Sequence, residues 1–386
     1  SDRLLVMHDG RVIEEGPTAA VFAEPQHEQT ARMLAAVRSP RRFAPDMRSG
    51  QRRPVLDLDS VSVRYPTRQG IFRRHSIVAL QPLRLTLRPG ETVAVVGESG
   101  SGKTSLARAV LGLVAPDTGT VSYLGSQLAP TLKARKHAER KHLTLVFQDP
   151  VASLNPAMRV EQIVGEPLSV QRGDLSPAER ADAVRAVLAR VGLDESLLPR
   201  LPHQLSGGQA QRVAIARAVV NRPSVLICDE AVASLDTSVR QGILKLLADE
   251  QRRTALSVIF ISHDLTVVRQ LSHRVLVLYM GHVCEEADAE AVFARPLHPY
   301  TRGLIDSIPA PDPSQRALRA PVVGEVPSMM EPPTGCVFHP RCAYAVGRCS
   351  AERPDLKRVG DRAVACWRAE ELDLASTADP GASAHR

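Results

Sequence analysis

The chain has 386 residues and a formal net charge of +7, so it is too long for one ordinary domain. Its composition, 44% apolar and 24% charged, excludes a chain that is disordered throughout. Aromatic residues make up only 3%, too few for the stacking surfaces of single-strand nucleic-acid binders. No stretch approaches the roughly 18 consecutive apolar residues that a membrane-spanning helix needs, so we expect a soluble protein that reaches a membrane only through a partner.

The chain begins with one copy of an internal repeat. Residues 1–37 align without gaps on residues 272–308 at a constant offset of 271, and both copies contain R-x-L-V-x-x-x-G-x-V-x-E-E followed by A-V-F-A-x-P-x-H-x-x-T. Such a repeat predicts the end of one unit followed by a whole second unit. We therefore expect residues 1–40 to be the remnant of a first unit. The chain would then be the C-terminal part of a tandem protein, and Ser1 would not be its natural start.

Two segments lack any apolar period. Residues 41–54, rich in Arg and Pro, are predicted to be a linker, and a solvated tether is favoured over a contact with lipid headgroups. The polar residues 370–386 are predicted to be a disordered tail.

Apolar runs alternate with helical stretches between the linker and about residue 285. A periodic segment over residues 178–191 predicts an amphipathic helix in an inserted helical lobe. Four short apolar runs predict buried parallel strands, and together they indicate an α/β fold. These runs are Thr92–Val96, Leu143–Phe147, Ser224–Cys228 and Ser257–Ile261.

A phosphate-binding loop follows the first of these strands. Its sequence, G-E-S-G-S-G-K-T, is the G-x-x-x-x-G-K-T motif, here placed between a strand and an apolar helix expected at 105–113. Glycines allow backbone N–H groups to surround phosphate oxygens, Lys103 reaches the β and γ phosphates, and Thr104 offers a hydroxyl to Mg²⁺. The predicted nucleotide-binding residues of the loop are Gly97, Ser99, Gly100, Ser101, Gly102, Lys103, Thr104 and Ser105.

Two carboxylates end the strand that begins near Ser224. Because successive side chains of a strand point in opposite directions, Asp229 and Glu230 are predicted to divide two roles. Asp229 would hold Mg²⁺, and Glu230 would activate the water that attacks the γ-phosphate. Cys228, inside the strand, is predicted to be a buried structural residue.

The segment L-S-G-G-Q at 205–209, followed by Q-R-V-A-I-A-R-A, resembles the signature of ATP-binding cassette (ABC) ATPases. The resemblance covers residues 55–285 and implies a P-loop NTPase domain with a helical subdomain at about 149–205. It also implies that ATP and Mg²⁺ are bound, with Thr104, Gln148 and Asp229 around the metal. Further residues that it implies are Tyr65 stacking on adenine, Asp236 near the opposite cassette, His263 at the γ-phosphate, and Lys103, Gln148 and Glu230 in catalysis.

In this family the signature serves the nucleotide of another cassette. The resemblance implies that Ser206, Gly207, Gly208 and Gln209 face the γ-phosphate bound by the opposite cassette of a head-to-tail pair. The expected mate is the upstream cassette of the same polypeptide or a second ATPase subunit.

Two further segments narrow the resemblance to the oligopeptide and dipeptide importer ATPases. They are F-Q-D-P-V-A-S-L-N-P at 147–156 and P-L-H-P-Y-T-R at 296–302. The resemblance implies a position at the cytoplasmic face of the cell membrane, two permease subunits that contact Gln148 and the helical lobe, and a solute-binding protein acting indirectly. Ala233-Ser234 and Ala210 depart from the usual pattern, but neither replaces a catalytic group.

Residues 286–369 resemble the C-terminal extension of these importers, in some of which four Cys hold a [4Fe-4S] cluster. Here the candidates are Cys336, Cys342, Cys349 and Cys366. Their spacing does not match common zinc sites, so Zn²⁺ and free reduced thiols stay open as alternatives to the cluster. Cys284, outside this group, is predicted to be structural.

Two other classes of function remain open at this level. The basic charge favours a cassette protein acting on ribosomes or DNA, but the short linker and the lack of a long heptad insertion count against it, so no specific nucleic-acid partner is expected. Intact Glu230 and His263 disfavour a catalytically silent interaction subunit. Co-purification of a permease would test the first alternative, and turnover by a Glu230→Gln variant would test the second. The transported solute is not encoded in this chain.

Overall fold

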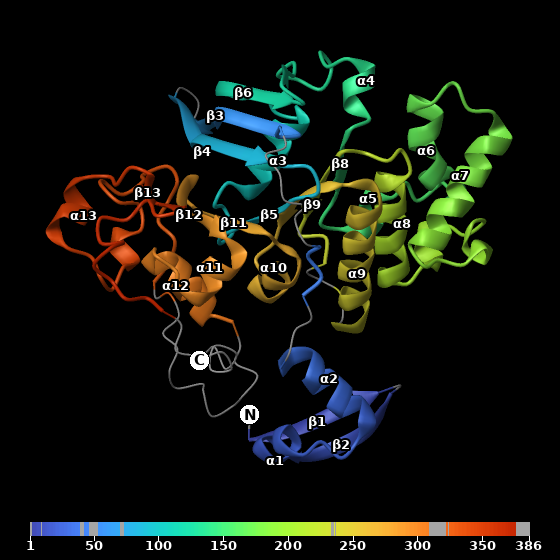
Figure 1. Ribbon diagram of the computed structural model, residues 1–386, viewed down its shortest axis with the longest axis horizontal. Helices are drawn as coiled ribbons and strands as arrows, with labels where there is room; N and C mark the ends of the chain where they lie inside the picture. The colour runs from blue at the N-terminus through green and yellow to red at the C-terminus, as the bar shows by residue number, and fades with distance from the viewer. Residues whose placement is uncertain are drawn as a thin grey trace.

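The structure is a computed structural model that describes residues 2–8, 10–38, 42–45, 53–69, 73–232, 235, 237–308, 322 and 324–375. In Figure 1 an antiparallel sheet lies at the top, a helical lobe in green at the right and the C-terminal extension in orange and red at the left. No helix in these residues is long and apolar enough to cross a membrane.

The two copies of the sequence repeat have the same local structure. In each, a β-hairpin is followed by a short helix and then a second helix. Both hairpins shift register at the same aligned position, between Val6 and Met7 in the first and between Val277 and Leu278 in the second. The elements are β1 (Arg3–His8), β2 (Arg11–Pro17), α1 (Thr18–Ala23) and α2 (Glu28–Arg38), and then β11 (Arg274–Tyr279), β12 (His282–Asp288), α11 (Ala289–Ala294) and α12 (Pro299–Asp306).

Part of the expected tether is bound to the cassette, so the prediction of a solvated linker is wrong for residues 42–45. The N–H groups of Phe43 and Ala44 donate to the carbonyl oxygen of Gln270 at 2.7 and 3.1 Å. Arg42 forms an ion pair with Glu290. The Phe43 side chain packs against a hydrophobic core, which gives this segment an apolar reason to stay in contact.

The central sheet has eight strands in the described part of the chain, in the order β13-β14-β12-β11-β5-β10-β9-β8. All four predicted strands are present, within one residue of the expected bounds, and they pair in parallel. Every residue of β5 is buried, as expected for a strand covered on both faces. The strands not yet given bounds are β5 (Thr92–Val96), β8 (Leu143–Val146), β9 (Val225–Asp229), β10 (Ser257–Ile261), β13 (Lys357–Val359) and β14 (Arg362–Val364).

A second, antiparallel sheet covers the phosphate loop's helix. It runs in the order β4-β3-β6-β7, and its strands β3 and β4 pack against α3. The helix begins at Lys103 and ends at Leu111, two residues earlier at each end than expected, because Gly102 and Gly112 adopt left-handed conformations at its two caps. The elements are β3 (Leu56–Gln69), β4 (Arg73–Leu87), α3 (Lys103–Leu111), β6 (Thr118–Tyr123), β7 (Ser126–Gln127) and α4 (His137–Arg140).

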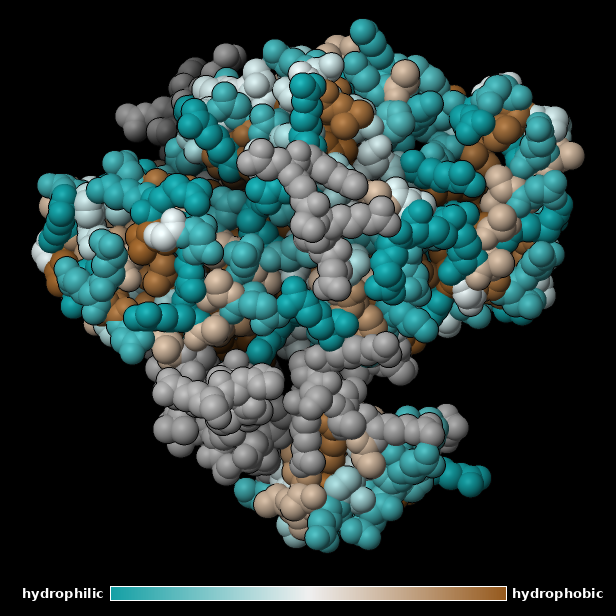
Figure 2. All heavy atoms as spheres, viewed as in Figure 1, coloured by the Kyte–Doolittle hydropathy of each residue, from teal (hydrophilic) through white to brown (hydrophobic). Residues whose placement is uncertain are grey.

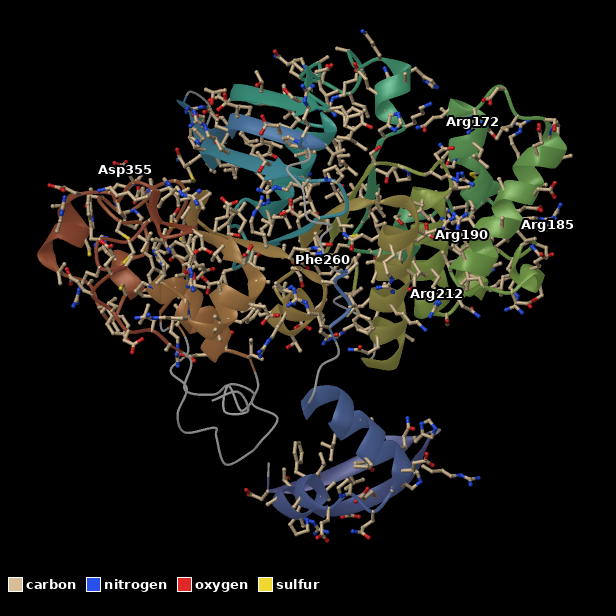
Figure 3. The ribbon with its side chains drawn as sticks, viewed as in Figure 1. Arg172, Arg185, Arg190, Arg212, Phe260 and Asp355 are labelled. Carbon is tan, nitrogen blue, oxygen red and sulfur yellow. The ribbon has the colours of Figure 1, made fainter. Side chains whose placement is uncertain are left out.

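The helical lobe follows β8 and contains the expected amphipathic helix as α7. Partly buried arginines make two of its contacts (Figure 3): Arg190 pairs with Glu250, outside the lobe, at 3.2 Å, and Arg212 donates to the Val191 carbonyl within it at 2.5 Å. The elements are α5 (Pro150–Ser153), α6 (Val160–Gln171), α7 (Pro177–Arg190), η1 (Glu195–Leu197), η2 (Pro202–Gln204) and α8 (Gly207–Val219), with α9 (Thr237–Thr254) and α10 (Leu265–Leu271) beside the sheet.

The C-terminal extension joins the central sheet through β14, which pairs with β12. Its other elements are η4 (His339–Arg341) and α13 (Gly347–Ala351). The predicted disordered tail is wrong for residues 370–375, because Leu374 is buried and its carbonyl accepts a hydrogen bond from Arg302 at 3.1 Å. Residues 376–386 lie outside the described part.

Candidate functional site

The predicted phosphate loop lies between β5 and α3 in a conformation that requires glycine at two positions. A Cβ at Gly97 would come within 2.1 Å of the Leu278 carbonyl oxygen, and one at Gly102 within 2.5 Å of the Ala79 carbonyl oxygen. Gly102 also has φ +103°, which side chains disfavour. Ser99 and Gly100 are exposed at the tip of the loop, whereas Ser101 is buried.

The ammonium group of Lys103 is held inside this loop. Its Nζ donates to the carbonyl oxygens of Gly97 at 2.7 Å and Glu98 at 2.8 Å, and lies 3.3 Å from Ser101 Oγ. Burial lowers the pKa of Lys103, while the carboxylates of Glu230, Asp229 and Glu98 oppose that shift. The loop therefore presents a buried positive charge with acidic groups nearby.

Asp229 and Thr104 offer oxygen donors at the end of β9 and the start of α3. Burial, foremost, and the Glu230 charge raise the pKa of Asp229, whereas the Thr104 side chain and Lys103 lower it. Carboxylate and hydroxyl oxygens suit Mg²⁺, which keeps several waters when it binds beside phosphates. These two residues therefore fit the expected metal. Ser105 is half buried in the first turn of α3.

Glu230 joins two other predicted residues in one network. Its Oε2 accepts a hydrogen bond from Gln148 Nε2 at 2.7 Å, and its Oε1 lies 3.2 Å from His263 Nδ1. Gln148, Glu230 and His263 follow β8, β9 and β10, which are neighbours in the sheet, so their side chains meet at the carboxyl edge. The amide of Gln148 is thus engaged by Glu230. Glu230 has φ +49°, an unusual backbone conformation for a residue with a side chain.

The signature segment lies elsewhere in the cassette. Ser206 caps α8: its Oγ accepts the Gln209 N–H at 3.2 Å, and Gln209 Oε1 accepts the Ser206 N–H at 2.9 Å. Gly207 and Gly208 form the first turn of this helix. Helix α8 packs against α5, α6, α7 and β8, whereas α3 packs against β3, β4 and β9. The structure therefore does not bring Ser206 to the phosphate loop of its own chain.

Two other predicted residues are less defined. Tyr65 lies in β3 with its ring half buried against a core, and its hydroxyl is buried without a hydrogen-bond partner among the described residues. Asp236, with Ala233 and Ser234, lies outside the described residues.

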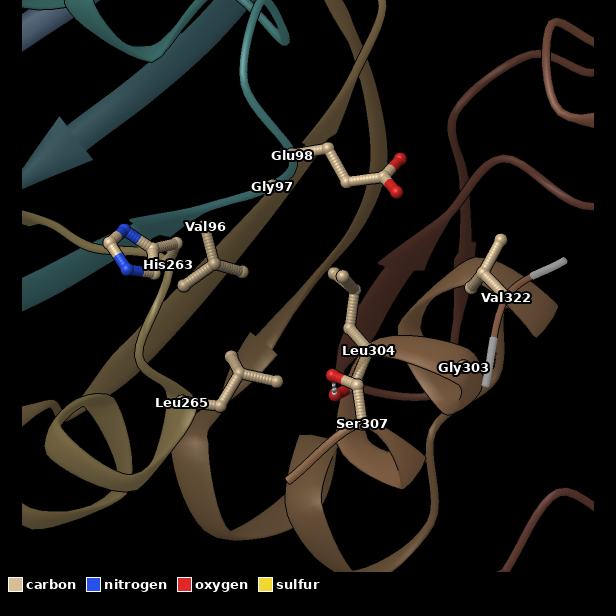
Figure 4. A pocket seen from close by; sticks show the side chains of 9 residues that line it. All are labelled: Val96, Gly97, Glu98, His263, Leu265, Gly303, Leu304, Ser307 and Val322. Atoms are coloured by element: carbon tan, nitrogen blue, oxygen red, sulfur yellow. Dashed lines mark hydrogen bonds between the residues drawn. The ribbon is translucent and has the colours of Figure 1, made fainter. Parts of the chain in front are cut away.

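A cavity of about 230 Å³ is lined in part by His263, Gly97 and Glu98 but is not the phosphate cradle. Figure 4 shows it between His263 on one side and α12 on the other, with Gly97 and Glu98 from the phosphate loop at its upper edge. Leu265, Leu304 and Val322 give it apolar walls. It separates the end of β5 from the extension.

The four candidate metal-binding cysteines line one small cavity next to Trp367. Burial raises the pKa of Cys336, Cys342 and Cys366, the last to about 11, so these thiols are protonated in the metal-free protein. Within the described ranges, no group of three or more His, Cys, Asp or Glu could hold a metal ion. The described residues thus form no metal site in this structure, and the cluster and Zn²⁺ stay predictions.

Sequence reasoning missed two residues around these sites, Arg341 and Tyr300, and it missed one feature of a third, Cys284. Cys284 is structural and buried, as expected, but it also lies close enough to Cys336 and Cys366 for their charges to affect its pKa. Arg341 and Tyr300 reach Glu98 of the phosphate loop from the extension. Both lie in segments that resemble importer ATPases, but no spacing rule links them to Glu98, which lies 202 residues before Tyr300 and 243 before Arg341.

Family models match two parts of the chain. The model described as "ABC transporter" matches residues 80–233, and the model described as "Oligopeptide/dipeptide transporter, C-terminal region" matches residues 284–349. The second match covers the part of the extension that contains Cys336, Arg341, Cys342 and Cys349.

Named relatives match over most of their length. The oligopeptide transport ATP-binding protein OppF of Salmonella typhimurium is 42% identical over 83% of this chain and 98% of its own. The di/tripeptide transport ATP-binding protein DppF of Pseudomonas aeruginosa is 40% identical over 82% of this chain and 98% of its own.

Solved structures match the cassette. The ATP-binding cassette MJ0796, in a dimeric post-hydrolysis state bound to ADP and phosphate, is 30% identical with a TM-score of 0.54, covering 61% of this chain and 98% of that one. The structure of cbiO1 from Clostridium perfringens, part of the transporter complex cbiONQ, is 29% identical with a TM-score of 0.53, covering 62% and 90%. With the loop, the carboxylates and the signature in place, the chain belongs to the ATP-binding subunits of the oligopeptide and dipeptide ABC transporter family.

Proposed function

We propose that this chain hydrolyses ATP to energise the import of peptides, or a related small solute, through separate permease subunits. The observation that carries the proposal is the hydrogen-bonded group of Gln148, Glu230 and His263 beside the phosphate loop. The names of the relatives support the class of solute.

The proposed chemistry divides the labour among these residues. Lys103 and the loop N–H groups bind the β and γ phosphates, because they offer positive charge where the triphosphate is most negative. Mg²⁺, held by Asp229 and Thr104, would neutralise the charge that develops on the phosphates. Glu230 accepts the proton of the attacking water, and His263 and Gln148 hold its carboxylate at the required position.

A Glu230→Gln variant tests this assignment. It keeps the shape of the side chain and removes the base, so we expect ATP turnover to fall by about 10²-fold or more while ATP binding survives. Glu195→Gln, at an exposed position of η1, is the matched control and should turn over normally. Unchanged turnover by Glu230→Gln would remove Glu230 from the mechanism.

Two membrane permeases at the cytoplasmic face are the proposed partners, with a solute-binding protein acting through them. Phe147 and Val151, on either side of Gln148 in the chain, are about half exposed, which supports a contact surface at the start of the helical lobe. Replacement of both by Ser should uncouple ATPase activity from transport in reconstituted vesicles while leaving ATP binding intact.

A second ATPase cassette is the further proposed partner, and the first repeat copy is the proposed contact. In the second copy, β11 pairs in parallel with β5, the strand that leads into the phosphate loop, and Leu276 and Leu278 are fully buried. Their counterparts Leu5 and Met7 are 51% and 61% exposed. Figure 2 shows apolar residues on the visible face of this lower unit.

The equivalence between the copies supports one occupant for that face: the strand of another cassette that corresponds to β5. Hydrogen exchange of the β1 amides tests it. We expect strong protection of β1 in the assembled importer and weak protection in this chain alone, because an edge strand exchanges until it is paired. Equal exchange in both would contradict the proposal.

Metal binding by the four cysteines stays a prediction, supported only by their gathering around one cavity. Iron, sulfide and zinc analysis of anaerobically purified protein decides it. Iron and sulfide at about four atoms each per chain would establish a [4Fe-4S] cluster. Metal-free protein with titratable thiols would rule out both metals.

A further inference from the structure

The C-terminal extension forms a bidentate ion pair with Glu98, the second residue of the phosphate loop. Arg341 donates from Nη1 and Nη2 to the two carboxylate oxygens of Glu98, at 2.6 and 2.9 Å. The Arg341 side chain is only 5% exposed, and that of Glu98 is 28% exposed. Figure 4 shows the Glu98 carboxylate pointing away from His263. A two-pronged contact of this kind fixes orientation as well as charge.

The extension also forms a hydrogen bond with the backbone of Glu98. The Glu98 N–H donates to the Tyr300 hydroxyl at 2.8 Å, and Tyr300 is fully buried in α12. This N–H therefore does not face the phosphate cradle. The Glu98 carbonyl oxygen accepts from Lys103, so one residue connects the extension to the lysine that binds the phosphates.

An aromatic cluster holds Arg341 and Tyr300, the two residues that contact Glu98, in place. The ring centroids of Tyr279, Tyr300 and Phe338 lie 4.7 to 5.3 Å apart. The Arg341 guanidinium lies 5.7 Å from the Tyr279 ring centroid. Such contacts contribute beyond simple burial. The rotamers of Tyr300 and Arg341 are therefore restricted before any nucleotide binds.

The ion pair between Arg341 and Glu98 has a specific consequence for nucleotide binding. Lys103 Nζ donates to the Glu98 carbonyl oxygen at 2.8 Å, so the Glu98 carboxylate belongs to a residue that directly contacts the ammonium group. An unneutralised carboxylate at this position would repel a triphosphate and compete with it for the ammonium group. The ion pair with Arg341 removes most of that negative charge, and Glu98 raises the pKa of Arg341 in return.

We propose that Arg341 and Tyr300 are positioning residues for ATP: they neutralise and orient Glu98 so that the phosphate loop is shaped for the triphosphate before it binds. The extension is then a structural part of the nucleotide site. This inference needs only ATP binding and is independent of the transported solute.

An Arg341→Met variant of the full chain tests the charge. We expect the Kd for MgATP, measured with a fluorescent ATP analogue, to rise roughly tenfold, which corresponds to about 1.4 kcal/mol at 25 °C. The rise should be smaller for ADP, which carries less charge. At saturating ATP, kcat should stay within about twofold, because the groups around Glu230 are untouched.

Arg348→Met is the matched control. Arg348 lies in the same extension and pairs with Glu352, but both side chains are more than half exposed, and the pair is distant from the loop in sequence and contact. This variant should leave the Kd for MgATP unchanged. A rise equal to that of Arg341→Met would mean that any loss of charge in the extension weakens binding, which contradicts the proposal.

Rescue separates charge from simple support. In the double variant Arg341→Met, Glu98→Gln the repelling carboxylate is gone, so the Kd should return to within about threefold of the original value. A Kd that stays high would mean that Arg341 only supports the fold, and it would overturn the proposal that Arg341 acts by neutralising Glu98. An unchanged Kd in folded Arg341→Met would overturn it as well.

Tyr300→Phe provides a second test if Arg341→Met does not fold. It keeps the ring in the aromatic cluster and removes only the acceptor of the Glu98 N–H. We expect a Kd increase of several-fold with kcat nearly unchanged, because an unsatisfied N–H lets the loop rearrange. Unchanged binding would show that Tyr300 does not position the loop.

Discussion

The two repeat copies have the same local structure in different surroundings. In both, a glutamate of the second strand accepts two consecutive backbone N–H groups: Glu14 from Gln26 and His27, and Glu285 from Leu297 and His298. Yet Glu285 is fully buried, whereas Glu14 is partly exposed. The comparison teaches that the hairpin and helices form from local sequence, while burial comes from strands distant in the chain, β5 beside β11 and β14 beside β12.

The largest difference between the copies should appear in core packing. Leu276→Ala removes a side chain that is fully buried beside β5, so we expect it to lower the free energy of unfolding by about 2–5 kcal/mol. The aligned change Leu5→Ala, at an exposed position, should alter it by less than about 0.5 kcal/mol. Urea unfolding of this chain, followed by circular dichroism, measures both. Equal losses would mean that the first copy is already covered.

A smaller difference should separate the two glutamates. Glu285→Ala leaves the buried N–H of His298 and its neighbour without an acceptor, at a cost of about 1–3 kcal/mol for each group. Glu14→Ala should cost less, because water can replace an exposed carboxylate. The shift in the thermal unfolding midpoint checks this order. A larger shift for Glu14→Ala would show that the hydrogen bonds, and not their burial, decide the effect.

The smallest effect is a difference in titration. The Thr30 side chain and the N–H groups of Gln26 and His27 lower the pKa of Glu14 below 4.5, whereas burial raises the pKa of Glu285 above it. Stabilisation by Glu14 is therefore present at higher pH and is lost as pH falls through its lowered pKa. The contribution of Glu285 is full below pH 4.5 and is lost as pH rises through its raised pKa.

Carboxyl ¹³C NMR of the two residues measures both titrations directly. Glu14→Gln and Glu285→Gln assign the signals. Matching midpoints for the two carboxyl groups would contradict the difference in burial, which is the basis of the comparison.

The sequence by itself predicted the features that depend on nearby residues. The phosphate loop, the four parallel strands and the amphipathic helix of the lobe were all found, because each needs only a short motif or an apolar period. The errors lie where distant contacts decide: residues 42–45 bind the cassette, and Leu374 of the expected tail is buried, although both segments look like solvated chain.

Only the tertiary structure brought Gln148, Glu230 and His263 within hydrogen-bonding distance, and only it placed Arg341 on Glu98. Short-range hydrogen bonding and periodicity depend on residues that are close in sequence, so they can be predicted from the sequence. Which side chains become buried together depends on how strands are ordered in the sheet, and that order pairs residues with no pattern in common.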